Sequence, residues 1–252
     1  MVECWLSLPA GVLIALVAST VGIGGGILWM PFLLIIMKLP PEKAVVTSLM
    51  IQTAGMGSGT LAFWHQKSID PKLLLLLLPI TIPGIALGAY LTRVLAPTHL
   101  ELILGMLTLT TALIFVSANQ GYTNHGQARV DPRKARRSAW IVSAMAVGSG
   151  MLSVSIGEWL VPYLRGRLAL RMNVAVATSI ATVFGTCVMG TVLHLCIGSR
   201  TEWATVGWAV PGVIVGAQIG PRIAERINER VLKEVFIFLL TLIGIHLIYN
   251  SY

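Results

Sequence analysis

Apolar runs long enough to cross a membrane dominate this chain. A bilayer-spanning helix needs about 20 predominantly apolar residues, and the sequence contains eight such runs, separated by polar gaps: residues 5–37, 44–64, 73–92, 100–116, 139–164, 173–197, 203–220 and 231–248. This pattern predicts an all-α polytopic membrane protein.

A polar stretch divides the runs into two sets of four. Residues 119–137 carry glycines, a proline and a basic run, which is the composition of a loop. We therefore expect an N-terminal transmembrane repeat over 1–118, a basic cytoplasmic loop over 119–137 and a C-terminal transmembrane repeat over 138–252.

The two halves match each other at the residues that punctuate the runs. One constant offset in residue number, which we call the repeat offset, relates Pro31 to Pro162, Ala44-Val45 to Ala175-Val176, Thr47-Ser48 to Thr178-Ser179, and Gly59-Thr60 to Gly190-Thr191. A slightly smaller offset relates Pro83-Gly84 and Gly88-Ala89 to Pro211-Gly212 and Gly216-Ala217. So many matches predict an internal repeat, and the small residues of the second block predict close helix packing or hinge-like bending, with packing favoured.

The basic residues indicate how the first run of each half is folded. If every run crosses once, the 18 Lys and Arg divide ten against eight, so the positive-inside rule has no side to choose. If each first run is instead a helical hairpin broken at its middle, they divide fourteen against four. The run 5–37 is long enough for two short arms, whereas 139–164 also fits a single tilted span.

A hairpin followed by three crossings inserts the second half upside down relative to the first. Each half then has an odd number of full crossings, which gives two inverted-topology repeats. This is a recurring plan of secondary transporters, whose substrate lies near the membrane midplane beside broken helices. The loop 119–137 would be cytoplasmic, with both termini outside.

Composition supports a membrane protein and excludes several other classes. Hydrophobic residues make up 56% and charged residues 11% of the 252 residues, whereas about a quarter of a soluble domain is charged. The net charge of +8 sits in short gaps between runs, where orientation in the bilayer explains it without nucleic acid. Cysteines and histidines lack metal-ligand spacing, and no GxSxG motif is present. We expect no metal, no cofactor and no enzymatic activity.

A glycine cluster interrupts the first run at residues 24–26. Gly24, Gly25 and Gly26 disfavour a continuous helix, and Pro31 follows them. One interpretation is close packing of membrane helices. We favour the other, a backbone-lined ligand site, where free amides at a helix N-terminus would bind an anion.

The matching place in the second half differs from the first. Ser155, Ile156 and Gly157 stand at the positions of the three glycines, and Glu158 stands at the position of Ile27. We expect Ser155 and Gly157 to contact the substrate. An ionisable residue within an apolar run is a functional hypothesis by default, so Glu158 is a candidate proton carrier; the alternative is an interfacial carboxylate paired with Arg165 or Arg167.

Hydroxyl pairs occupy the same place in the second run of each half. The side chains of Thr47, Ser48, Thr178 and Ser179 either bond back to their own helix or face the hairpin tips and donate to an anion, and the sequence leaves both interpretations open. Gln52, one turn after Ser48, is a further candidate for the same site.

Taken together, these motifs resemble the TauE/SafE family of sulfite exporters. The resemblance rests on Gly-Ile-Gly-Gly-Gly-x-Leu-x-x-Pro at 22–31, Ala-x-x-Thr-Ser at 44–48 and 175–179, and Pro-Gly-x-x-x-Gly-Ala in both halves. It covers nearly the whole chain, with a departure at 155–158, where a second glycine triplet would be usual.

The resemblance implies a multi-pass transporter of the cell (inner) membrane that exports sulfite or organosulfonates. Its expected partners are a small anionic substrate and the lipid bilayer, and a homodimer is left open. The glycine hairpin, both Thr-Ser pairs and the second hairpin would surround the substrate. A non-transporting membrane module, either an assembly partner or an intramembrane enzyme, is the alternative function.

Overall fold

The computed structural model describes residues 4–21, 24–117, 126–130, 135–136, 139–224 and 229–250. Over these residues the chain forms ten α-helices and no β-sheet, apart from one isolated β-bridge between Gln127 and Leu170. The first half contains a short 3-10 helix η1 (Cys4–Leu6), then α1 (Ser7–Val21), α2 (Gly26–Pro31), a π-helix η2 (Phe32–Ile36), α3 (Pro41–His65), α4 (Pro71–Val94) and α5 (Pro97–Ser117). The second half contains α7 (Ala139–Leu152), α8 (Gly157–Gly166), α9 (Met172–Cys196), α10 (Trp203–Ala224) and α11 (Glu229–Asn250).

Both first runs are broken, as the sequence predicts. In the first half α1 ends at Val21 and α2 begins at Gly26, and in the second α7 ends at Leu152 and α8 begins at Gly157. Each break leaves two short helices, and the helix that follows, α3 or α9, is 25 residues long in both halves. At 1.5 Å per residue these two helices reach about 37 Å, which is enough to cross a bilayer.

The apolar helices fit a membrane. Within the described residues three helices are long and apolar enough to cross it alone, namely Pro71–Val94, Pro97–Ile114 and Met172–Cys196. Shorter apolar helices accompany them, including those on both sides of the first break and the one before the second break. Large apolar side chains such as Leu13, Leu75 and Leu113 are exposed on the outer surface of the bundle, where lipid would cover them.

Glycines bring the first helix of each half against the fourth helix of the other. A Cβ atom added at Gly84 or Gly88 of α4 would overlap the carbonyl oxygen of Ser143 or Val147 on α7. The same holds on the opposite side of the bundle, where Cβ atoms at Gly212 and Gly216 of α10 would overlap the carbonyls of Leu8 and Val12 on α1. The close packing predicted from the Pro-Gly-x-x-x-Gly motifs is therefore present at both positions.

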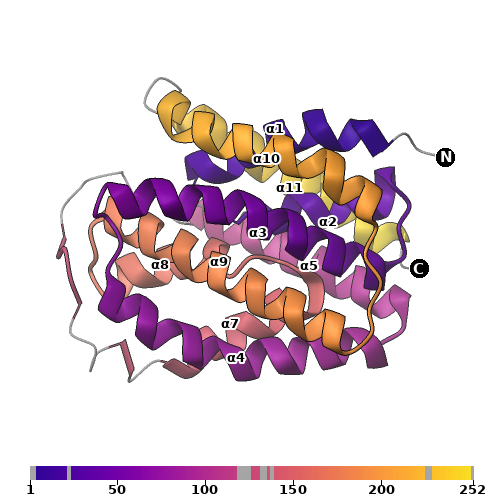
Figure 1. The fold of residues 1–252 in the computed structure, drawn as a ribbon, viewed down its shortest axis with the longest axis horizontal. Helices are drawn as coiled ribbons and strands as arrows, with labels where there is room; N and C mark the ends of the chain where they lie inside the picture. The colour runs from indigo at the N-terminus through magenta and orange to yellow at the C-terminus, as the bar shows by residue number, and fades with distance from the viewer. Residues whose placement is uncertain are drawn as a thin grey trace.

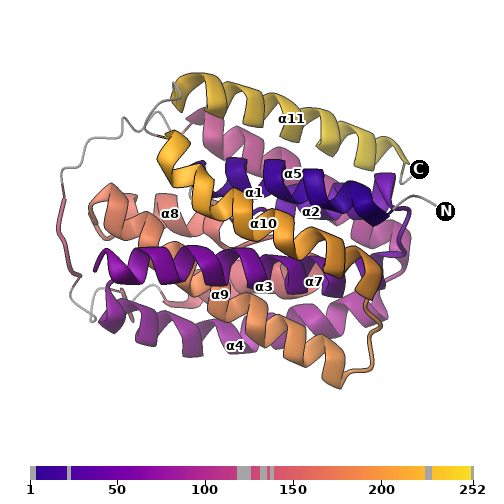
Figure 2. The ribbon, with the colours of Figure 1, turned by 45° about the horizontal axis from the view of Figure 1, so that its top comes forward.

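The remaining long helices pair across the two halves. α3 packs along α9, and α5 along α11, the second pair forming one edge of the bundle (Figure 2). Gly59 on α3 lies at Ile180 and Gly190 on α9 lies at Leu49, so α3 and α9 run in opposite directions. The central pair α3 and α9 carries the polar residues of the candidate site, and both views show it in the middle of the bundle (Figures 1 and 2).

Candidate functional site

The two breaks meet in the interior of the bundle. A Cβ atom at Gly24 would overlap the side chain of Ser155, and one at Gly26 would overlap the carbonyl oxygen of Ser153. Gly157 completes the contact, since its Cβ position lies 3.4 Å from the amide nitrogen of Gly24. Residues 24–26 and 153–157 are all buried. We call these two segments the joined breaks.

The helix after each break begins with a different local hydrogen-bond pattern. Gly25 has φ 75°, a left-handed conformation that favours glycine, and its carbonyl accepts the amides of Leu28 at 3.0 Å and Trp29 at 2.9 Å, which starts α2. In the second break Ser153 takes the left-handed conformation with φ 55°. The hydroxyl of Ser155 then accepts the Gly157 amide at 3.0 Å, which starts α8.

Gln52 on α3 joins the first half to the second break. Its Nε2 atom lies 3.0 Å from the Ser153 carbonyl oxygen, 2.7 Å from the Ser153 hydroxyl and 3.1 Å from the Ser48 hydroxyl. Because a carbonyl oxygen only accepts hydrogen bonds, the amide NH₂ must face Ser153. The Oε1 atom of Gln52 is buried and has no hydrogen-bond partner.

Two further buried polar side chains at this level have unpartnered atoms. Both carboxyl oxygens of Glu158, the second residue of α8, lack a hydrogen-bond partner, and the side chain is fully buried. The alternative of an interfacial ion pair with Arg165 or Arg167 is therefore not what the structure shows. The hydroxyl of Ser179, one turn before Val183 on α9, is equally buried and unpartnered. Buried polar groups are normally paired, so these atoms, which lie next to residues that form or contact the joined breaks, are the candidate ligand contacts.

The threonine of each Thr-Ser pair makes a hydrogen bond with the other half of the chain. The Thr47 hydroxyl accepts the backbone amide of Glu202 at 3.1 Å, just before α10, and the Thr178 hydroxyl accepts the amide of Asp70 at 3.0 Å, just before α4. Each hydroxyl satisfies an amide at the start of a helix in the other half, because first-turn amides have no partner within their own helix. Contact of Thr47 and Thr178 with the anion stays a prediction.

Replacing Thr178 by valine should destabilise the protein, because the buried Asp70 amide would lose its acceptor. An unsatisfied buried amide costs about 1–3 kcal/mol, and the same is expected for Thr47→Val. Thr110→Val is the matched control, since the Thr110 hydroxyl is exposed and bonds back to Met106 of its own helix. Thermal unfolding in detergent measures the effect; equal midpoints for Thr178→Val and Thr110→Val would contradict it.

Sequence reasoning missed two residues of the site. Ser153 receives the Gln52 amide, and Val183 contacts the Cβ positions of Gly24 and Gly157 at 2.9 Å and 3.2 Å. The repeat could have indicated both, because the repeat offset makes Ser153 equivalent to Gly22, in the glycine motif, and Val183 equivalent to Gln52, a predicted site residue. The remaining predicted residues Gly24, Gly25, Gly26, Ser48, Gln52, Ser155 and Gly157 lie at the joined breaks.

A bundle of apolar helices that encloses two broken helices in contact is the architecture of a multi-pass membrane transporter. Comparison with known proteins agrees with this class. The family model "Sulfite exporter TauE/SafE" matches residues 7–247, and the chain belongs to this family, which confirms the resemblance seen in the sequence. The chain is also 26% identical over 271 residues to the "Probable membrane transporter protein YunE" of Bacillus subtilis (strain 168), with 96% of each chain covered. No solved structure shows a significant match.

Proposed function

We propose that this chain is a secondary transporter, in the export direction, of small sulfur-containing anions such as sulfite or organosulfonates, and that the anion binds at the joined breaks. The observation that carries the proposal is the meeting of two broken helices beside buried polar atoms without partners. The family description names sulfite export, which supports the substrate class.

Two inverted halves form the framework of the proposal, and the helix pairs support them. α1 packs parallel to α10, and α7 packs parallel to α4. The first helix of each half thus packs in the same way on the equivalent helix of the other half. Backbone details repeat as well, since Lys38 and Ala169, and Lys67 and Gly198, all have positive φ and are related by the repeat offset. α1 and α3 begin at one end of the bundle and α9 at the other (Figure 1).

Charge supports an orientation with the loop 119–137 in the cytoplasm of the cell. In the inverted arrangement fourteen of the 18 Lys and Arg fall on the side of this loop, and four, namely Lys38, Lys43, Arg93 and Arg200, fall on the other. The positive-inside rule assigns the richer side to the cytoplasm.

The chemistry of the joined breaks suits an anion that arrives with a proton. α8 begins at Gly157, and the N-terminal end of a helix favours negative charge. The free hydroxyl of Ser179 adds a donor. An unpaired buried carboxylate is far more costly to bury ionised than protonated, and its charge would repel the substrate, so Glu158 would bind its proton when the anion is bound. Rocking of one half against the other would then expose the site to each side in turn.

Counterflow in liposomes tests the proposed function. Purified protein is reconstituted into vesicles loaded with unlabelled sulfite, and entry of labelled sulfite is followed, with protein-free vesicles as the control. We expect saturable entry that organosulfonates inhibit. Absence of counterflow with sulfite and with a panel of organosulfonates would refute the substrate class and favour a non-transporting module.

The inverted arrangement makes a separate prediction about sidedness. Cysteines placed singly at Lys38 and Arg136, in a variant without native cysteines, should react with a membrane-impermeant thiol reagent from opposite sides of the membrane. If both positions were labelled from the same side, the two halves would not be inverted by hairpins.

A further inference from the structure

A pocket of about 120 Å³ lies between helices on one side of the joined breaks, one turn from residues that contact them. It lies between α1, α3, α9 and α10, and its lining includes Ser19, Met56, Phe63, Gln66, Ile180 and Gln218. Met56 follows Gln52 by one turn on α3, and Ile180 precedes Val183 by one turn on α9, so the pocket adjoins the joined breaks along both central helices. Gln66 is exposed at the end of α3 and marks the mouth.

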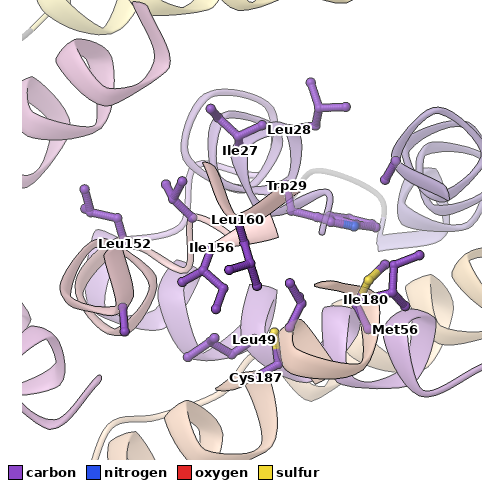
Figure 3. Close-up of a cluster of buried hydrophobic side chains, with 14 of the residues drawn as sticks. Ile27, Leu28, Trp29, Leu49, Met56, Leu152, Ile156, Leu160, Ile180 and Cys187 are labelled. Atoms are coloured by element: carbon purple, nitrogen blue, oxygen red, sulfur yellow. The ribbon is translucent and has the colours of Figure 1, made fainter. Parts of the chain in front are cut away.

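The repeat defines an equivalent place on the other side of the joined breaks. The repeat offset relates Ser19 to Gly150, Met56 to Cys187, Phe63 to His194, and Leu49 to Ile180. Cys187 follows Val183 by one turn, and Leu49 precedes Gln52, so this second place adjoins the joined breaks in the opposite direction. Figure 3 shows both pairs, with Met56 beside Ile180 and Cys187 beside Leu49.

The second place is closed, whereas the first is open. The His194 imidazole Nε2 lies 2.7 Å from the carbonyl oxygen of Gly150, which fastens α9 to the end of α7. The Thr92 hydroxyl donates to the Met151 carbonyl at 2.7 Å and fastens α4 to the same end. Cys187 and Met56 are both buried, and the two places differ at their outer ends: His194 is buried, whereas Phe63 is half-buried and Gln66 is exposed. At the open side the position equivalent to His194 is Phe63, whose ring has no nitrogen to form such a bond.

We propose that the pocket at Met56 and the closed place at Cys187 are two alternating access sites for the transported anion, and that the hydrogen bond between His194 and Gly150 keeps the second one shut. This rests on the proposed function. A cavity of about 10–15 Å³ already holds one water molecule, so the pocket has ample room for a small oxyanion. Its polar lining consists of the neutral Ser19 hydroxyl and the Gln66 and Gln218 amides, which bind an anion weakly enough to release it.

Thiol reactivity at the two equivalent positions tests the proposal. One variant keeps Cys187 alone, with Cys4→Ser and Cys196→Ser, and the other carries Met56→Cys with all three native cysteines replaced. Purified protein is labelled with a maleimide under native conditions, and labelling after unfolding gives the total. We expect faster labelling at Met56→Cys, which lines the pocket, than at Cys187.

Breaking the closing hydrogen bond should shift reactivity between the two sites. His194→Phe installs the residue found at the open side, and a net hydrogen bond of about 0.5–1.5 kcal/mol corresponds to a shift of about 2- to 10-fold. We expect Cys187 labelling to rise and Met56→Cys labelling to fall. Thr92→Val should act in the same direction, which provides a second test if His194→Phe does not fold. His65→Phe, at an exposed histidine on α3, is the matched control.

Opposite changes at the two cysteines would support alternating access. An unchanged Cys187 rate, or rates that rise together at both positions, would overturn the proposal, because the latter indicates general loosening. Since labelling needs no substrate, a failure of sulfite counterflow would refute the substrate class and leave this result intact.

Discussion

Gly26→Ala is expected to abolish transport and to lower the thermal stability of the protein. The new methyl group would overlap the Ser153 carbonyl and crowd the Gln52 amide. The overlapping group belongs to the backbone of Ser153, which is held in a left-handed conformation and cannot move aside as a flexible side chain can. Overpacking of a buried position typically costs about 1–3 kcal/mol, and here it would also separate the joined breaks.

Gly207→Ala is the matched control for Gly26→Ala. Gly207 lies within α10, and a Cβ atom there meets no neighbour within 4 Å. Alanine is favoured over glycine inside a helix by about 1 kcal/mol, so this variant should be as stable as the parent or more so. Thermal unfolding in detergent and counterflow in liposomes measure both variants; a Gly26→Ala protein as stable and active as Gly207→Ala would contradict the contact between the breaks.

Glu158→Gln is expected to abolish pH-driven flux and to preserve exchange. The neutral amide has nearly the shape of a carboxyl group and removes the cost of burying an unpaired charge, so the protein should fold. Flux driven by a pH gradient should fall by at least about tenfold, because no group at the joined breaks would bind and release the coupled proton. Vesicles with a pH gradient and an internal pH reporter measure the coupled flux, and counterflow at equal pH measures exchange.

Glu42→Gln provides the control for this substitution, since Glu42 is an exposed carboxylate in the first turn of α3. It should leave both kinds of flux unchanged. If Glu158→Gln retained the pH dependence of the parent, Glu158 would not be the coupling residue. A loss of exchange together with pH-driven flux would give Glu158 a role in substrate binding.

The sequence predicted where the first runs break, because glycines and the repeat mark those positions independently of tertiary contacts. It also predicted the close helix packing, since Pro-Gly-x-x-x-Gly recurs in both halves and only glycine permits backbones to touch. These signals are local to the chain. Residues such as Gly26 and Gly88 therefore reveal their positions without knowledge of the partner helix.

The directions of the hydroxyl side chains were not predictable in this way. Thr47 and Ser48 are neighbours in the sequence, yet Thr47 bonds to the start of α10 and Ser48 to Gln52. Which one faces the breaks depends on the rotation of α3 against elements of the other half. The same limit applies to the open pocket and its closed counterpart, because the difference comes from one ring nitrogen, that of His194, placed against the Gly150 carbonyl.

The most direct test of the proposed binding site compares two serine-to-alanine variants. Ser179 and Ser7 are both fully buried, and both hydroxyls lack partners, but only Ser179 lies one turn from Val183, whose side chain contacts the joined breaks. Neither substitution removes a hydrogen bond within the protein, so both variants should be as stable as the parent.

The measurement is the half-saturation concentration for sulfite in counterflow. A hydrogen bond to a charged group contributes about 1.5–3 kcal/mol, so Ser179→Ala should raise this concentration by at least about tenfold, whereas Ser7→Ala should leave it unchanged. An unchanged value in Ser179→Ala, in a protein that transports sulfite, would contradict binding of the anion at the joined breaks.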